Sequence, residues 1–355
     1  MLVVRDCLLK ADTKNSGPGS LFFYVALLFA LLVSGCGGAS TQLSESVFTG
    51  PIMGTDYRIV VRHAADSDTN QIEASVITAM ESVNTSMSTY LESSEISLFN
   101  QSAAGVEHII SEDFRAVLSE ALGIAELTQG AFDPTIGPVV NAWGFGPQGK
   151  IVRQPTEEAL LALRSRVGYE KVNLVGNKLS KQVDGLYLDL SAIAKGFAVD
   201  KVADVLSALG IRDFLVNIGG ELRGSGTSKS GSAWRVGVEK PQIQGGVQQV
   251  VQLTNMSIAT SGDYRNFVVL DGQHFSHTIS PVTFKPVLQK LASVSVLSER
   301  CSTADALATA LLSMGQARAE AFVRAHRLAT YMLVRSEQGD GVNAIVSPEF
   351  EINLQ

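Results

Sequence analysis

The spacing of apolar residues predicts several helices. Ile72, Val76, Met80, Val83 and Met87 follow one another at intervals of four, four, three and four residues. Because an α-helix turns once in about 3.6 residues, this spacing predicts an amphipathic helix with one buried stripe. Further helices are predicted at 114–127, at 156–166, from about residue 191 to Leu209, at 303–312 and at 317–325.

Alternation of apolar and polar residues predicts strands, for example over 56–62. A hairpin is predicted at 172–183, around Gly176 and Asn177. Other strands are predicted at 186–190, 214–218, 234–239, 247–253, 257–260, 264–270, 292–297, 329–335 and 343–346. Since helices and strands come in blocks and do not alternate strictly, the predicted fold class is α+β, with largely antiparallel sheets and packed helices.

The N-terminal segment has the pattern of a secretory signal. Residues 21–33 are apolar and uncharged, which is short for a bilayer span of about 20 residues. Basic residues precede this run, and Ser34, Gly35 and Cys36 follow it, which resembles the lipobox of bacterial lipoproteins. We therefore expect a signal peptide at 1–35 and lipidation of Cys36. The alternative is a short membrane anchor with an incidental cysteine.

After the signal, we expect a flexible tether at 36–48 and one globular domain at 49–355, with a possible subdivision near 146–155. With 45% hydrophobic and 18% charged residues, the chain can bury a core. The net charge of −7 gives no indication of a nucleic-acid partner. Once Cys7 is cleaved off and Cys36 is lipidated, Cys301 is the remaining thiol, which suits an oxidising compartment.

Two glycine-containing segments are candidates for ligand binding. Residues 130–138 and 143–146 combine turn formers with aromatic side chains, so they could hold a planar ring or form a structural corner. Residues 189–197 run from a predicted strand into a helix, whose N-terminus could bind a phosphate beside Lys195. The alternative there is an ordinary turn with a solvated lysine.

Three more segments carry possible chemistry. Residues 217–226 form a glycine-rich link that could cradle a phosphate or be a bulged turn. His277, near the end of a strand, could be a general base or a hydrogen-bonded turn residue. Asp305 and Thr309 are four residues apart, so they share one helix face and could bind a hard cation such as Mg²⁺. Alternatively, Asp305 belongs to a helix cap formed with Ser302.

Taken together and in order, these segments resemble the ApbE family of bacterial FAD:protein FMN transferases. The resemblance extends from about Met53 to about Leu333 and rests on MGTDYRIV, MSTY, SEISLFN, GAFDPTIGPVVNAWGFG, DLSAIAKGFAVD, NIGGELRGSG, SIATSGDYRNF, HTISP and CSTADALATALL. It implies an ApbE-like fold, FAD as substrate and a divalent cation beside its pyrophosphate.

The resemblance also implies residue roles. FAD contacts are implied for Met53, Tyr90, Ala131, Phe132, Asp133, Asp189, Lys195 and Ile279. Mg²⁺ or another divalent cation would take the carbonyl of Ala192, the side chains of Asp305 and Thr309, and a possible carbonyl from Ala308. Ser280 and Phe284 depart from the family pattern, which often has an acidic residue or Asn at the first position and Gly at the second.

The implied reaction moves FMN from FAD to a Ser or Thr hydroxyl of an acceptor protein and releases AMP, with His277 as the candidate base. Two alternatives stay open: hydrolysis of FAD to FMN and AMP, and a lipoprotein that only binds flavin. By analogy with the family, the acceptor is a periplasm-facing subunit of a membrane redox complex. The expected location is the bacterial cell envelope, lipid-anchored and facing the periplasm, on either the inner or the outer membrane.

Overall fold

A computed structural model describes residues 43–354, except 242–245, 264–266, 271–272, 288–289 and 337–340. The predicted signal peptide and Cys36 lie outside the described residues. Within the described part of the chain, no helix combines the length and the apolar character needed to cross a membrane. Residues 264–266 of the predicted strand at 264–270 also lie outside the described residues.

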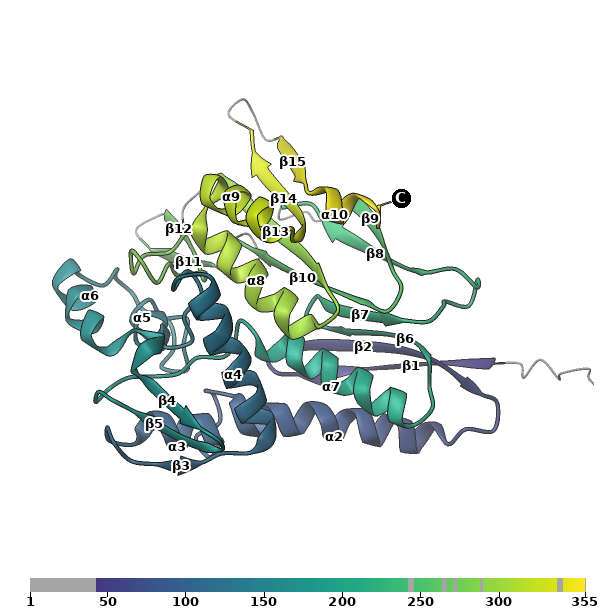
Figure 1. Ribbon diagram of the computed structural model, residues 1–355, viewed down its shortest axis with the longest axis horizontal. Coiled ribbons are helices and arrows are strands. Elements are labelled where there is room, and N and C mark those ends of the chain that lie inside the picture. Colours follow the sequence, from purple (N-terminus) through teal and green to yellow (C-terminus); the bar gives the residue numbers. More distant parts are fainter. Residues whose placement is uncertain are drawn as a thin grey trace, which may run out of the picture. The chain divides into compact units, whose positions relative to one another are not determined.

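The centre of the fold is an eight-stranded sheet in which every neighbouring pair is antiparallel (Figure 1). Its order is β1 (Leu43–Ile52), β2 (Thr55–Ala64), β6 (Asp213–Ile218), β7 (Glu221–Ser225), β10 (Met256–Gly262), β13 (Leu291–Ser298), β14 (Ala329–Arg335) and β15 (Val342–Val346). The first two strands are joined by Met53 and Gly54, both with positive φ, as a two-residue hairpin turn of this type requires.

Three helices cover one face of this sheet: α2 (Thr69–Met87), α7 (Ala194–Ala208) and α8 (Cys301–Met314). The apolar stripe predicted for 72–87 is buried as expected, in the largest core of the protein. The Asp68 side chain accepts hydrogen bonds from the amides of Asn70 and Gln71, which explains where α2 begins. Helix α9 (Gln316–His326) packs beside α8.

The opposite face is covered by a hairpin, β8 (Trp234–Glu239) and β9 (Val247–Leu253), and by the short helix α10 (Pro348–Glu351). Their side chains form a second core with residues of the sheet such as Val60, Leu297 and Leu333. The sheet is therefore buried on both faces.

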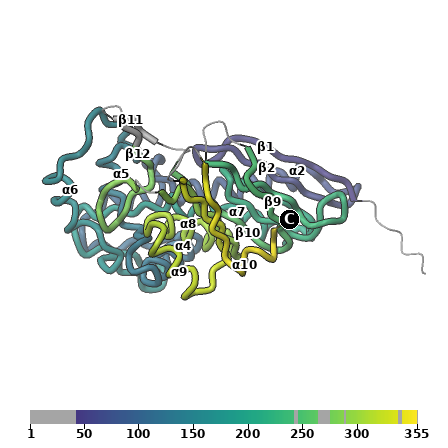
Figure 2. The backbone as a smooth tube through the Cα atoms, turned by 90° about the horizontal axis from the view of Figure 1, so that it is seen from above, coloured from purple at the N-terminus to yellow at the C-terminus, as the bar shows by residue number. Residues whose placement is uncertain are grey.

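The remaining elements form a lobe beside α4 (Glu112–Leu127), and both views place α5 and α6 at the end away from β1 (Figures 1 and 2). It contains α3 (Glu95–Gln101), α5 (Gly137–Ala142), α6 (Glu157–Leu163), two short 3₁₀ turns (Arg164–Arg166 and Tyr169–Lys171), a sheet of β3 (His108–Ile109), β5 (Lys178–Lys181) and β4 (Val172–Val175), and the hairpin β11 (Phe267–Leu270) and β12 (Gln273–Ser276). Ile279, Trp143 and Phe284 belong to its small core.

The structure corrects two predictions, the first of which is the extent of the tether. The sequence predicts residues 43–48 in the tether, but they pair with β2, because Phe48 is buried against the core and the backbone forms the edge of the sheet.

The second correction concerns residues 186–190, which do not form a strand of any sheet. Their leucines are buried, as an alternating pattern predicts. However, the Asn100 side chain forms hydrogen bonds with both the amide and the carbonyl of Leu188, and the amide of Asp189 donates to the carbonyl of Pro134. Residues 146–155 link α5 to α6 inside a single unit that starts at Leu43.

Candidate functional site

A charge cluster formed by Lys195, Glu221 and Asp305 surrounds the first turn of α7. The ammonium of Lys195 lies 2.7 Å from Oε1 of Glu221, the first residue of β7. The amide of Gly196 donates to Oδ2 of Asp305 on α8 at 3.1 Å. Both carboxylates are buried. Gly219 and Gly220, both with positive φ, form the tight turn that brings Glu221 to this place.

Two buried carboxylates therefore act on one ammonium, that of Lys195, whose side chain is 29% exposed. Burial alone would lower the pKa of Lys195, but Asp305 and Glu221 more than offset it and raise that pKa above its usual value. Burial, reinforced by Asp305 and opposed by Lys195, raises the pKa of Glu221 to about 7. Burial also raises the pKa of Asp305. Oε2 of Glu221 is buried without a hydrogen-bond partner. The excess negative charge and this unpartnered oxygen fit a site that takes a cation.

The raised pKa of Glu221 predicts how the stability of the ligand-free protein depends on pH. Between the ordinary value of 4.5 and about 7, the folded protein holds a proton on Glu221 that the unfolded chain releases. We therefore expect the free energy of unfolding to fall as the pH rises through this window. Chemical denaturation at a series of pH values measures it. Glu221→Gln should flatten the slope; an unchanged slope in that variant would contradict the assignment.

The oxygen donors predicted for a cation lie around the same turn. In an unbroken helix the Gly196 amide would donate to the carbonyl of Ala192, but here it donates to Asp305. The hydroxyl of Thr309, one turn after Asp305 on α8, is 2.9 Å from that of Ser261. Ala308 lies inside α8, where carbonyls accept helical hydrogen bonds, so its role is the least supported by geometry. Among the described residues, no cluster of three His, Cys, Asp or Glu side chains is suited to a metal. The predicted cation ligands include a single carboxylate, that of Asp305.

A second group of predicted residues comes together where three loops meet. Tyr90 follows α2, is 65% exposed, and donates its hydroxyl to the carbonyl of Phe145 at 3.0 Å. The ring of Phe145 meets that of His277 edge-on, with centroids 6.4 Å apart. Although the Tyr90 side chain is largely exposed, its partial desolvation and then the nearby charge of Asp189 raise its pKa. Tyr90, Asp189 and His277 therefore belong to one neighbourhood.

Asp133 and its neighbours have structural partners in this protein. Both oxygens of the Asp133 carboxylate accept hydrogen bonds within the lobe, from Thr135 and from the amide of Tyr169. The side chains of Ala131, Phe132 and Ile279 are buried in the cores. If these residues contact FAD, they do so through backbone atoms or through the shape of the loop.

Met53 lies near the charge cluster. It occupies the turn between β1 and β2, and the amide of Gly219 donates to the carbonyl of Asp56 in the second of these strands. The turn that carries Met53 is therefore next to the turn that leads to Glu221. Of the predicted set, Met53, Lys195 and Asp305 are associated with this region, and Tyr90 and His277 with the other.

The departure at Phe284 has a geometric explanation. Its φ is +60°, in the left-handed region that favours glycine, the residue often found there in the resembled family. The strain is offset because the ring is buried, Arg164 lies over it at 4.9 Å, and the Trp143 indole donates to its carbonyl at 2.9 Å. Ser280 is buried in the same loop, and its carbonyl accepts from the Phe284 amide.

The sequence patterns assign no role to two buried acidic residues, Glu221 of the charge cluster and Asp200 of α7. Glu221 lies inside the glycine-rich segment 217–226, and Asp200 ends the DLSAIAKGFAVD segment. Asn100, in SEISLFN, was also missed as the residue that holds 186–190. The sequence feature that could have identified these three residues is the presence of an acidic or amide side chain inside each segment.

Comparison with known proteins places this geometry in a family. The model of the ApbE family matches residues 53–332. The chain belongs to the ApbE family. It is 42% identical to the FAD:protein FMN transferase of Vibrio cholerae over 317 residues, which cover 89% of this chain and 94% of that one. It is 39% identical to the FAD:protein FMN transferase of Haemophilus influenzae over 328 residues, covering 89% and 93%.

The fold agrees with a solved structure of the ApbE family. The flavin transferase ApbE from Vibrio cholerae superimposes with a TM-score of 0.81 at 40% identity, covering 88% of this chain and all of that one. The resemblance seen in the sequence and the predicted α+β class are both confirmed. The individual site residues stay predictions, supported by the two groups described above.

Proposed function

We propose that this protein transfers FMN from FAD to a hydroxyl side chain of an acceptor protein and releases AMP. The observation that supports this most strongly lies at the start of α7, where Lys195 meets the buried carboxylates of Glu221 and Asp305. A lysine and the first amides of a helix suit a diphosphate. Membership of a family whose named relatives are FAD:protein FMN transferases supports the same activity.

The residues present fit a divalent cation such as Mg²⁺. Asp305 would contribute its carboxylate, Thr309 its hydroxyl and Ala192 its carbonyl, all hard oxygen donors of the kind that Mg²⁺ prefers. When bound, the cation would stabilise negative charge that develops on the diphosphate. Lys195, held in place by Glu221, would add a positive charge to the same site.

The remaining steps follow from the second group of residues. Exposed Tyr90 would lie against FAD, since an aromatic ring can pack on the flavin. The acceptor oxygen attacks the phosphorus next to riboflavin, a new P–O bond forms, and the bond to the AMP phosphate breaks. His277 accepts the hydroxyl proton, and AMP leaves with the bridging oxygen. FMN then remains attached through a phosphoester.

Transfer and hydrolysis both release AMP, and the same residues could serve both reactions. The dependence of AMP release on an acceptor therefore separates them. The protein is incubated with FAD and Mg²⁺, with and without an acceptor peptide that contains a reactive Ser or Thr. The proposal expects AMP to form in step with flavinylated peptide and to depend on the peptide. AMP and free FMN formed equally well without it would identify an FAD pyrophosphatase.

We also propose that the mature protein is anchored by lipid on Cys36, so that it reaches an acceptor subunit of a membrane redox complex from the periplasmic side of the cell envelope. The support is the apolar run at 21–33 followed by Ser34, Gly35 and Cys36.

Mass spectrometry of the membrane fraction tests this anchoring. We expect an N-terminal lipidated Cys36 and no residues 1–35. Cys36→Ser should abolish lipidation, whereas Cys7→Ser, the matched change inside the leader, should leave it intact. A mature chain that retains residues 1–35 would contradict the proposal.

A further inference from the structure

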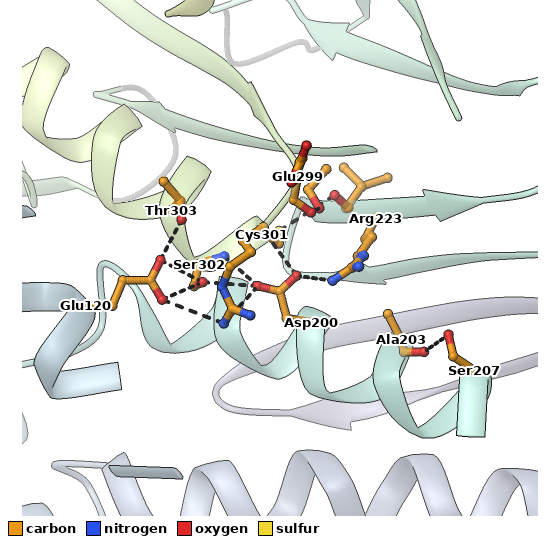
Figure 3. Close-up of polar contacts among 12 residues, drawn as sticks. Glu120, Asp200, Ala203, Ser207, Arg223, Glu299, Cys301, Ser302 and Thr303 are labelled. Carbon is orange, nitrogen blue, oxygen red and sulfur yellow. Dashed lines mark hydrogen bonds and ion pairs between the residues drawn. The ribbon is translucent and has the colours of Figure 1, made fainter. Parts of the chain in front are cut away.

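Helix α8 begins without a cap from its own segment. Arg300 precedes its first turn, and the Arg300 side chain makes no capping hydrogen bond. The amides of Cys301 and Ser302 donate to the two oxygens of Asp200 on α7, at 2.9 and 3.0 Å. Figure 3 shows the Asp200 carboxylate between this first turn and the guanidinium of Arg223. A carboxylate here satisfies amides that have no partner within the helix.

Helix α7 is capped from α8 in return. Ile193, which precedes α7, makes no side-chain capping bond. The amide of Gly196 donates to Asp305 of α8 at 3.1 Å. Each helix therefore supplies the carboxylate that caps the first turn of the other: Asp200 for α8 and Asp305 for α7.

The crossing of the two helices is tight at this place. A Cβ atom on Gly196 would collide with the backbone carbonyl of Cys301, so the two backbones approach closely. Asp200 is only 1% exposed, and its charge is balanced by Arg223 at 2.7 Å, with Arg300 farther away at 3.7 Å. Glu120 of α4 adds a further restraint by accepting from the hydroxyls of Ser302 and Thr303.

This arrangement fixes the predicted cation ligands relative to one another. Ala192 lies just before α7, whereas Asp305 and Thr309 lie on α8. The distance between the two sets therefore depends on how the first turns of the helices meet. We propose that Asp200 is a positioning residue of the cation site, which holds the ligand-bearing face of α8 against the start of α7. The inference rests on the proposed function, because it takes its cation ligands from there.

Asp200→Asn tests the inference while keeping the side-chain shape. The new amide group would turn an N–H donor toward one of the helix amides, leaving a buried donor unsatisfied. With FAD present, Mn²⁺ binding measured by the electron paramagnetic resonance of the free ion should weaken by about tenfold or more. FAD affinity, measured by flavin fluorescence in a chelator, should stay within about threefold of the wild type, because Asp200 contacts α8 and not the predicted FAD residues.

The control variant is Asp213→Asn. Asp213 also forms an ion pair with an arginine, Arg62, and accepts a hydrogen bond from a backbone amide, that of Thr227. It contacts none of the predicted cation ligands. It should lower thermal stability and leave Mn²⁺ affinity unchanged. Equal weakening of Mn²⁺ binding in both variants would overturn the inference, because general loosening would then explain it.

The remaining outcomes are also decisive. Wild-type Mn²⁺ affinity in folded Asp200→Asn overturns the inference and leaves the cation site standing. A wild-type protein that binds no Mn²⁺ overturns both. If Asp200→Asn does not fold, Arg223→Gln takes its place, since Arg223 holds the Asp200 carboxylate but touches no predicted ligand. We expect it to weaken Mn²⁺ binding by about threefold, and unchanged binding would overturn the inference.

Discussion

Asp305→Asn is expected to slow FMN transfer by at least about 10²-fold and to remove its dependence on Mg²⁺, because the change takes away the single carboxylate of the predicted cation site. The asparagine oxygen can still accept from the Gly196 amide, so the first turn of α7 keeps its cap. The measurement is single-turnover transfer to an acceptor peptide over a series of Mg²⁺ concentrations.

Asp68→Ala is the control for loss of a helix cap. Asp68 caps α2 through the amides of Asn70 and Gln71, far along the chain from the predicted ligands, and its loss should cost about 0.5–2 kcal/mol of stability. Transfer by this variant should stay at the wild-type rate. If Asp305→Asn also transferred FMN at the wild-type rate, Asp305 would be a cap for α7 and nothing more.

His277→Ala is expected to slow transfer by about 10²–10⁴-fold, the usual contribution of a general base, while FAD affinity changes little. The reason is the place of His277 against the ring of Phe145, whose carbonyl accepts a hydrogen bond from Tyr90. Flavin fluorescence titration gives the affinity, and single-turnover transfer gives the rate.

His326→Ala is the matched control for the histidine. His326 also contacts a phenylalanine ring, that of Phe322, with centroids 4.2 Å apart, but it lies at the end of α9. It should leave both rate and affinity unchanged. If His277→Ala lost FAD affinity in proportion to rate, His277 would be a binding residue and the base would lie elsewhere.

Much of the fold could be predicted because its signals are local. The stripe from Ile72 to Met87 and the hairpin at 172–183 depend on residues close together in sequence, and both form as expected. Several segments that resemble the ApbE family also gather around two neighbourhoods, one at Lys195 and one at His277.

The rest could not be predicted because its partners are distant in sequence. Gly196 and Asp305 are 109 residues apart, and the cap of α8 comes from Asp200, 101 residues before Cys301. Residues 186–190 alternate like a strand, yet the Asn100 side chain satisfies Leu188 in place of a neighbouring strand. In each case a polar side chain from another element determines the local structure. The pattern of apolar residues, from which the elements are predicted, does not indicate that side chain.

The central claim, that the protein attaches FMN to an acceptor, is tested most directly by the intact mass of the acceptor. The protein is incubated with FAD, Mg²⁺ and a candidate acceptor subunit, and the acceptor mass is then measured. The account predicts a gain equal to one FMN less one water, located on a Ser or Thr and absent when Mg²⁺ is chelated. An unchanged acceptor mass while FAD is converted to free FMN and AMP would contradict it.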